Sequence, residues 1–221
     1  MSFNRLSAED FVISSDSITS PLWSGGVITL TNTYTSSTQE AGSSGNFYLN
    51  IFHTASSDAS AEIQFAVAYG TKYGSGSRFY NSAVIGATST KTTYAQYQNL
   101  IIGDENTGFL FGGISSSDFW VISLDRTRYK ETLFPGSLSL VLSGSSGKIT
   151  LTDNSQTVSS ITFNDAGRVF QLVSGSQGTV YTGLNSNGYS PSGSYGWFLP
   201  DIGTLILHPS ALSASIGLNS S

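Results

Sequence analysis

The chain has no cysteine, few charged residues and only two histidines, His53 and His208, among its 221 residues. The lack of cysteine excludes a disulfide scaffold, a thiol nucleophile and any cysteine-ligated metal site. Asp, Glu, Lys and Arg make up 10% of the sequence, against about 25% in an average domain. Solubility therefore has to come from neutral polar residues, chiefly Ser, Thr and Gly.

The charge balance and the absence of long apolar runs limit the kinds of partner. The net charge is −5 with nine Lys and Arg residues, whereas nucleic-acid binding needs clustered basic side chains. No apolar run approaches the length of about 18 residues that indicates a transmembrane helix. Residues 1–11 contain no basic region followed by an apolar stretch, so we expect no secretory signal. We expect neither nucleic acid nor a membrane as a partner.

An apolar period of two residues recurs along the chain and predicts β-strands. Residues 61–69 are the clearest case, because Ile63, Phe65 and Val67 alternate with more polar positions. Further strand-like segments are residues 27–33, 47–53, 118–124, 137–142, 148–152, 168–173 and 203–207. Clusters of Gly, Ser and Asn between these segments predict turns. The fold class expected is all-β: an antiparallel β-sandwich or jelly-roll-like domain with long Gly/Ser-rich loops and one or two short helices.

No charged or proline-rich linker divides the chain, so we expect a single domain over residues 1–221. Within it, residues 1–23 are predicted to form an N-terminal arm or strand. Residues 213–221 are predicted to form a polar tail, the start of a longer chain. Residues 71–93 contain few strong apolar anchors, which is typical of a loop that reaches away from the core to another subunit. The two predicted helices are residues 93–100 and 125–131.

No short motif indicates catalysis or a metal. Residues 144–148, GSSGK, are too closely spaced for a phosphate loop, and Ile149 follows the lysine where Ser or Thr is required. Residues 103–108 lack the bidentate acid of a calcium loop and are interpreted as a turn. His53 and His208 both end strand-like segments and are interpreted as structural. We therefore predict no enzyme, no catalytic residue, no cofactor and no metal.

The charged segment at residues 125–131 is the strongest candidate for an interface. Five of its seven residues are charged, in a chain with 23 charged residues in all. One interpretation is a solvated helical turn, in which Asp125 pairs with Arg128 and Arg128 with Glu131. The other is a docking surface in which Arg126 and Arg128 supply the specificity, because Arg and Tyr are favoured at interfaces. The interface candidates are Asp125, Arg126, Arg128, Tyr129, Lys130, Glu131, Tyr73, Arg78 and Tyr80.

Several long strings of the sequence resemble virion structural proteins of T4-like contractile-tailed (myovirus) cyanophages. The strings are IIGDENTGFLFGG (residues 101–113), RTRYKETLFPGSLSLVL (126–142), ITLTDNSQ (149–156), FNDAGRVFQLVSGS (163–176) and GSYGWFLPDIGTLIL (193–207), and residues 3–23 also fit. The resemblance covers essentially the whole chain. It implies a non-enzymatic structural component of a bacteriophage particle, most simply of the tail or baseplate, assembled in the host bacterial cytoplasm.

The partners that this resemblance implies are other virion structural proteins and further copies of the chain in a symmetric assembly. An alternative function is a carbohydrate- or receptor-binding β-domain on the virion surface, in which Trp23, Trp120 or Trp197 stacks on sugar rings. Burial of Trp120 and Trp197 in the core would weaken that alternative. A glycan-degrading enzyme is a third possibility, but the sequence offers no carboxylate pair for it.

Overall fold

The computed structural model describes residues 48–74, 76, 89–129, 131–181 and 193–218, together with the backbone of residues 34–35. These residues form mostly antiparallel β-structure with two short α-helices, which confirms the all-β fold predicted from the sequence. The predicted arm at residues 1–23 and the predicted strand at residues 27–33 lie outside the described residues.

The strands are β1 (Tyr34–Thr35), β2 (Leu49–Phe52), β3 (Ile63–Thr71), β4 (Phe109–Phe111), β5 (Ile114–Ser116), β6 (Asp118–Leu124), β7 (Leu140–Gly144), β8 (Gly147–Asp153), β9 (Thr162–Asn164), β10 (Gly167–Ser176), β11 (Thr179–Val180), β12 (Gly196–Leu199) and β13 (Thr204–Leu207). The α-helices are α1 (Thr90–Ile101) and α2 (Pro209–Ile216), and the short 3-10 helices are η2 (Arg126–Arg128) and η3 (Pro200–Ile202).

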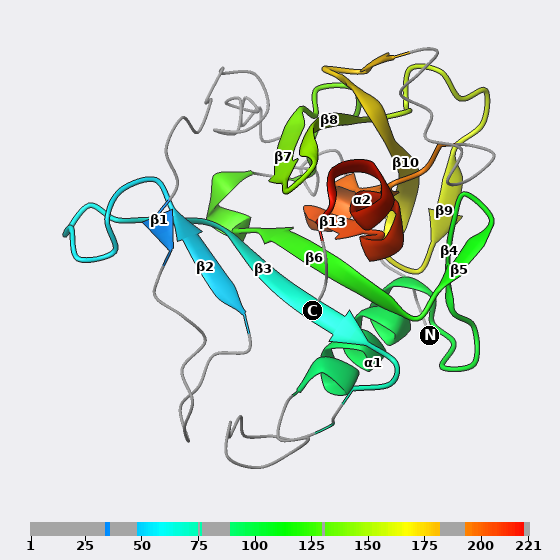
Figure 1. Ribbon diagram of the computed structural model, residues 1–221, viewed down its shortest axis with the longest axis horizontal. Helices are drawn as coiled ribbons and strands as arrows, with labels where there is room; N and C mark the ends of the chain where they lie inside the picture. The colour runs from blue at the N-terminus through cyan, green and yellow to red at the C-terminus, as the bar shows by residue number, and fades with distance from the viewer. Residues whose placement is uncertain are drawn as a thin grey trace, which may run out of the picture.

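Most strands belong to one large sheet that curls around α2 (Figure 1). Its order is β1-β2-β3-β6-β13-β12-β10-β8-β7, and β9 and β11 pair with β10 outside this path. Neighbouring strands pair antiparallel throughout. β4 and β5 form a separate hairpin. The C-terminal strand β13 thus lies between β6 and β12, and β1 and β7 are the two ends of the sheet order.

The face of the sheet that contacts α2 carries the first hydrophobic cluster. Its members include Ile122 of β6, Phe198 of β12 and Leu205 of β13, and α2 adds Leu212 and Ile216. Pro209 stands in the first turn of α2, where its missing N–H has no helical partner to lose. Gly217 ends the helix in the left-handed conformation, with φ of 68°. The apolar side of α2 therefore closes this face.

The opposite face carries the second cluster, which α1 and the β4–β5 hairpin cover. It contains Val121 of β6 and Ile206 of β13, packed with Tyr94 of α1 and with Phe109 and Phe111 of β4. Successive side chains of a strand point to opposite faces, so Val121 and Ile122 enter different clusters. Because both faces are covered, β13 is buried at all four positions.

Two sequence predictions need correction at this point. The polar tail expected at residues 213–221 is wrong for residues 213–216, which complete α2 and place Ile216 in the core. The strand predicted at residues 61–69 is observed two residues later, as β3, and Gln64, one of the more polar positions that alternate with Ile63, Phe65 and Val67, is only 5% exposed. The helix predicted at residues 93–100 is confirmed as α1, which extends beyond it at both ends.

Candidate interaction surface

The charged segment at residues 125–131 follows β6 and forms one short turn, not the seven-residue helix considered from the sequence. η2 covers only Arg126–Arg128, and Tyr129 returns to an extended conformation. Asp125 starts the turn, because its Oδ1 accepts hydrogen bonds from the Thr127 backbone N–H (2.9 Å) and hydroxyl (2.5 Å). These bonds from Thr127 hold the pKa of Asp125 below its ordinary value.

Arg128 pairs with a distant carboxylate and not with Asp125 or Glu131. Its Nη1 donates to Oε2 of Glu62 at 2.6 Å, which joins the turn to the residue just before β3. The Arg128 side chain is 11% exposed and the Glu62 side chain 56% exposed. The hydrogen bond from Arg128 lowers the pKa of the Glu62 carboxyl. Arg128 is therefore engaged within the chain, and the predicted i,i+3 pairing of the helix interpretation does not form.

Arg126 is exposed but folds back over Tyr129. Its guanidinium carbon lies 4.7 Å from the centre of the Tyr129 ring, and its Nη1 donates to the Tyr129 carbonyl oxygen at 2.5 Å. Tyr129 itself is buried in the first cluster. The Tyr129 ring is close to Gly203, where a Cβ would lie only 2.5 Å from ring atoms. Arg126 thus presents a cationic group at the surface in a position fixed by a buried aromatic ring.

A second ion pair, between Arg168 and Asp201, holds Thr132 in the segment that follows the charged turn. Asp201 of η3 accepts hydrogen bonds from the backbone N–H of Arg168 (2.7 Å) and from its Nε (3.0 Å), and also from its Nη2. Arg168 Nη2 also donates to the Thr132 hydroxyl at 2.9 Å. These contacts with Arg168 lower the pKa of Asp201. In the part of the chain that the structure describes, this pair and Arg128–Glu62 are the ion pairs formed.

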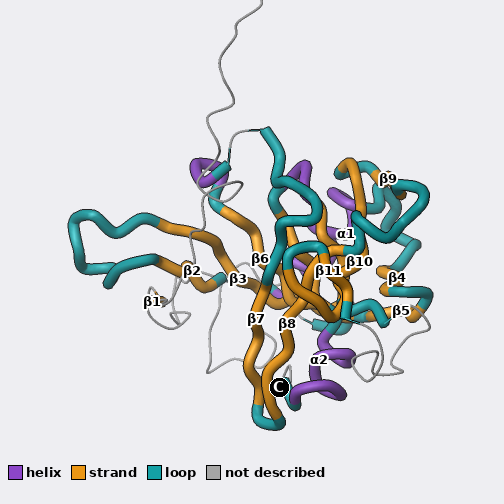
Figure 2. The backbone as a smooth tube through the Cα atoms, turned by 90° about the horizontal axis from the view of Figure 1, so that it is seen from above, coloured by secondary structure: helices purple, strands orange, loops and turns teal. Residues whose placement is uncertain are grey.

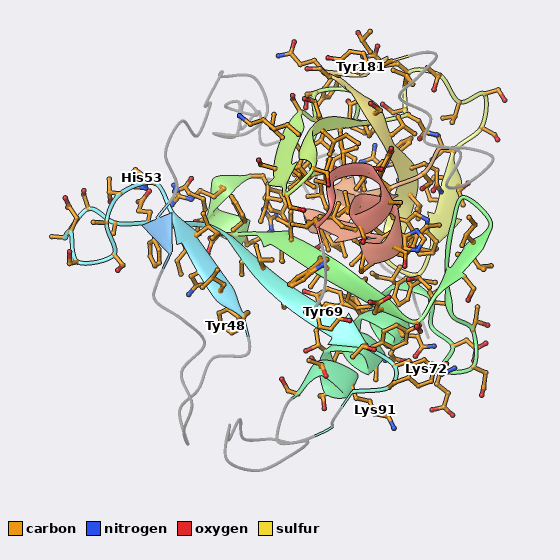
Figure 3. The ribbon with its side chains drawn as sticks, in the orientation of Figure 1. Tyr48, His53, Tyr69, Lys72, Lys91 and Tyr181 are labelled. Atoms are coloured by element: carbon orange, nitrogen blue, oxygen red, sulfur yellow. The ribbon has the colours of Figure 1, made fainter. Side chains whose placement is uncertain are left out.

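Tyr73, another interface candidate, lies far from the charged turn. It is 82% exposed and follows β3, while Asp125 follows β6. In the pairing of β3 with β6, Thr71 faces Asp118 and Phe65 faces Leu124. Tyr73 and Asp125 therefore lie at opposite ends of these two paired strands, about 20 Å apart at about 3.3 Å per residue. Figure 3 shows this separation: Lys72 lies at one end of β3, and His53 lies at the far end of the β2–β3 hairpin. The candidate residues therefore form at least two separate surfaces.

Of the remaining interface candidates, the structure describes only Glu131. Glu131 is exposed. Lys130, Arg78 and Tyr80 lie outside the described residues, as does most of the predicted loop at residues 71–93. Within that stretch, residues 90–93 form the start of α1.

Two of the tryptophans proposed as sugar platforms pack inside the fold. Trp120 is half-buried against the first cluster, with its ring centre 4.9 Å from that of Tyr69. Trp197 is half-buried against the second cluster, with ring centres 5.6 Å from Phe109 and 5.3 Å from Phe111. Their packing weakens the carbohydrate-binding alternative so far as it depends on these two residues. Trp23 lies outside the described residues.

Exposed apolar side chains form a further set of surface features that the sequence interpretation did not single out. The most exposed besides Tyr73 are Phe163 (67%), Phe134 (65%) and Val141 (60%). Val141 interrupts the alternation of β7, because Leu140, Val141 and Leu142 are all apolar. This unbroken apolar run could have indicated the exposed valine from the sequence, because a strand with one solvent-facing side normally alternates apolar and polar residues.

Among the described residues, no group of three or more His, Asp or Glu side chains is arranged to hold a metal ion. No helix in the described ranges is long and apolar enough to cross a membrane. Comparison with known proteins adds no identification: no protein-family model, no curated protein and no solved structure matches the chain.

Proposed function

We propose that the chain is a non-enzymatic structural component of a phage virion, in the contractile tail or the baseplate, that acts through protein–protein assembly. We propose a phage particle because several segments of the sequence resemble cyanophage virion proteins. These segments are residues 101–113, 126–142, 149–156, 163–176 and 193–207. The partners in this proposal are other virion proteins and further copies of the chain.

The structural observation that carries the assembly role is the set of large apolar side chains on the surface. Tyr73, Phe134, Val141 and Phe163 are each at least 60% exposed, although both faces of the sheet are closed by α1, α2 and the β4–β5 hairpin. Aromatic residues, like Arg, are enriched where proteins meet. Each of these side chains would bury apolar surface on contact with another protein, which makes them candidate contact points in an assembly.

Arg126, which lies over the buried Tyr129 ring, is the charged part of the proposed contact. The guanidinium of Arg126 is exposed, and its place over the Tyr129 ring limits the side-chain freedom lost on binding. A guanidinium binds a carboxylate of a neighbouring chain through two parallel hydrogen bonds.

Purification of the particle tests this proposal. A contractile-tailed phage that encodes the chain is banded on a density gradient, and the chain is quantified by mass spectrometry in the particle band and in the unbanded lysate. We expect the chain to band with particles in a fixed ratio to a tail protein. Recovery only in the unbanded lysate would overturn the proposal.

The carbohydrate- or receptor-binding alternative retains one structural feature in its favour. Tyr73 and Tyr181 are 82% and 43% exposed, and such rings can stack on sugars. The alternative expects the isolated chain to bind host surface polysaccharide, with the binding lost in Tyr73→Ala or Tyr181→Ala. Assembly into the tail without any such binding would favour the structural role alone.

A further inference from the structure

Along the outer edge of β7, two residues have backbone groups with no partner in the described part of the chain. β7 and β8 are joined by a two-residue turn between Gly144 and Gly147, which face each other across the hairpin. Hydrogen-bonded and non-hydrogen-bonded pairs alternate along an antiparallel ladder. Gly144, Leu142 and Leu140 therefore bond to β8, and the N–H and C=O groups of Val141 and Ser143 point away from it. These outward groups have no hydrogen-bond partner among the described residues.

β7 also lacks the features that usually protect an edge strand. Exposed edges are normally blocked by a charged residue, a proline, a bulge or a very short strand. β7 has the five-residue sequence LVLSG, and its register with β8 is regular along its whole length. The other end of the sheet differs, because β1 has two residues and the β2–β3 pairing shifts register between Ile51 and Phe52.

The edge is held in a fixed position by α2. The backbone N–H of Ser146 donates to the Ile216 carbonyl at 2.9 Å, and the Ser145 hydroxyl donates to the Gly217 carbonyl at 3.1 Å. On the other side of the strand, Leu140 and Leu142 pack against the first cluster. Figure 2 shows the β7–β8 hairpin extending beside α2. Because the strand is already ordered, a partner strand can pair with it at a small entropic cost.

We propose that β7 pairs antiparallel with β7 of a second copy of this chain, which makes one continuous sheet from two subunits. The partner is a second copy because the edge is self-complementary. A two-fold axis through Leu142 places Val141 opposite Ser143 of the second copy, and each such pair exchanges both of its N–H···O bonds. The proposal deepens the assembly role proposed above by naming one surface through which copies join.

Charge and side-chain placement are compatible with this register. Among the described residues 140–151, which form the paired part of the β7–β8 hairpin, Lys148 is the charged residue, and it faces Ser143 across that hairpin. In the paired sheet the two Lys148 residues are separated by three strand spacings, about 14 Å, which exceeds the screening length of about 8 Å at physiological salt. Val141, 60% exposed in the single chain, gains a direct neighbour from the second copy on the same face.

A five-residue edge alone buries less than a standard interface of about 800 Å² per partner, so we expect a concentration-dependent dimer. Sedimentation velocity of the full chain over a range of concentrations measures it. Val141→Lys, which adds a charge to the edge, should weaken the dimer by about tenfold or more. The matched control is Val158→Lys, which changes an exposed valine away from β7 and should leave the dimer unchanged.

Cysteine cross-linking tests the register, because the chain contains no cysteine of its own. A mixture of the single variants Val141→Cys and Ser143→Cys should give a disulfide-linked dimer on mild oxidation, since these residues are directly opposite. Each variant alone should cross-link far less, because like residues then lie diagonally, about 7–8 Å apart, at the limit of what a disulfide can span.

A chain that stays monomeric at every concentration and gives no more cross-link in the mixture than alone would overturn the β7 pairing. A Val141→Lys chain with unchanged self-association that no longer enters particles would overturn it too, and would assign the edge to a strand from another protein. In both cases, banding of the unmodified chain with particles would still support the proposed function. The two proposals therefore fail separately.

Discussion

Arg128 donates to Glu62 across 66 positions of sequence, and this contact ties the turn after β6 to the start of β3. From the sequence, Arg126 and Arg128 were equivalent candidates for an interface, but their contacts in the structure differ. Arg128 has 11% of its side chain exposed and acts within the subunit, whereas Arg126 stands at the surface over Tyr129. The two residues should therefore respond differently to the same substitution.

Arg126→Ala is expected to impair assembly without unfolding the chain. The cation over the aromatic ring contributes about 0.5–1 kcal/mol and the hydrogen bond to the Tyr129 carbonyl about 0.5–1.5 kcal/mol, so the free energy of unfolding should fall by no more than about 2.5 kcal/mol. Incorporation of the variant into particles, measured against the unmodified chain in a mixed infection, should drop several-fold. Arg128→Ala is the matched control, because it should cost more stability by leaving a buried site without its arginine stem. Normal incorporation of Arg126→Ala would exclude this arginine from the contact.

The Arg168–Asp201 pair should make stability depend on acid. Hydrogen bonds from Arg168 hold the pKa of Asp201 below its ordinary value of 3.8, so the unfolded chain takes up the proton first as the pH falls. The stabilisation is complete above about pH 5 and is lost as the pH falls through the lowered pKa. Asp201→Asn should therefore cost stability near neutral pH and progressively less below about pH 4. Urea unfolding at a series of pH values measures the difference.

Arg168→Gln provides the second arm of that experiment. It removes the guanidinium, which is the largest cause of the lowered pKa of Asp201, and keeps the backbone N–H of residue 168, so the stability of this variant should change less with pH over the acid range. A constant gap between the unmodified chain and Asp201→Asn at every pH would contradict the account of this pair.

Asp153 should be the carboxylate whose loss costs most stability among the turn-capping acids. It is fully buried, and both of its oxygens accept from the Gly136 backbone N–H at 2.9 Å, while Oδ1 also accepts from Ser155 N–H at 3.1 Å. Asp153→Ala leaves these buried donors unsatisfied and should lower the free energy of unfolding by about 1–3 kcal/mol. Asp104→Ala is the control, because Asp104 accepts from the Asn106 N–H in an exposed turn. Equal losses in the two variants would refute the role of burial.

Gly203 is predicted to tolerate no side chain because it combines positive φ with close packing. Its φ is 60°, and a Cβ would lie 2.5 Å from the Tyr129 ring. Gly203→Ala should therefore cost the left-handed strain of about 1–2 kcal/mol together with about 1–3 kcal/mol for displacing that ring. Gly113→Ala isolates the first cost, since Gly113 has φ of 89° and open space around it. Thermal melts that show the same loss for both would contradict the proposed packing.

Much of the sheet could be predicted because its strands carry strong local patterns. β6 begins and ends at the predicted residues 118 and 124, since its β-branched and aromatic residues are bounded by Asp118 and Asp125. The segments 47–53, 61–69, 148–152, 168–173 and 203–207 each contain most of an observed strand. Alternation could not reveal that both faces are covered, because this depends on α1, α2 and the β4–β5 hairpin packing from elsewhere in the chain.

Helix α2 and the charged turn are the places where local patterns failed, whereas α1 was predicted. In α2 the small residues Ser213, Ala214 and Ser215 resemble a polar tail, and only the contact of Leu212 and Ile216 with the sheet makes the segment a helix. In the turn, i,i+3 spacing suggested Asp125 and Glu131 as partners of Arg128. The actual partner, Glu62, is distant in sequence and comes close through the pairing of β3 with β6. Tertiary pairing of this kind leaves no signal in a short window of sequence.

The most direct test of the account is an electron cryomicroscopy map of intact particles of a contractile-tailed phage that encodes this chain. If the chain is a tail or baseplate component, density there, repeated with the symmetry of the tail, should fit the curled sheet with α2 inside it and the β4–β5 hairpin on the opposite face. A complete map in which other chains account for all tail and baseplate density would contradict the proposed structural role of this chain.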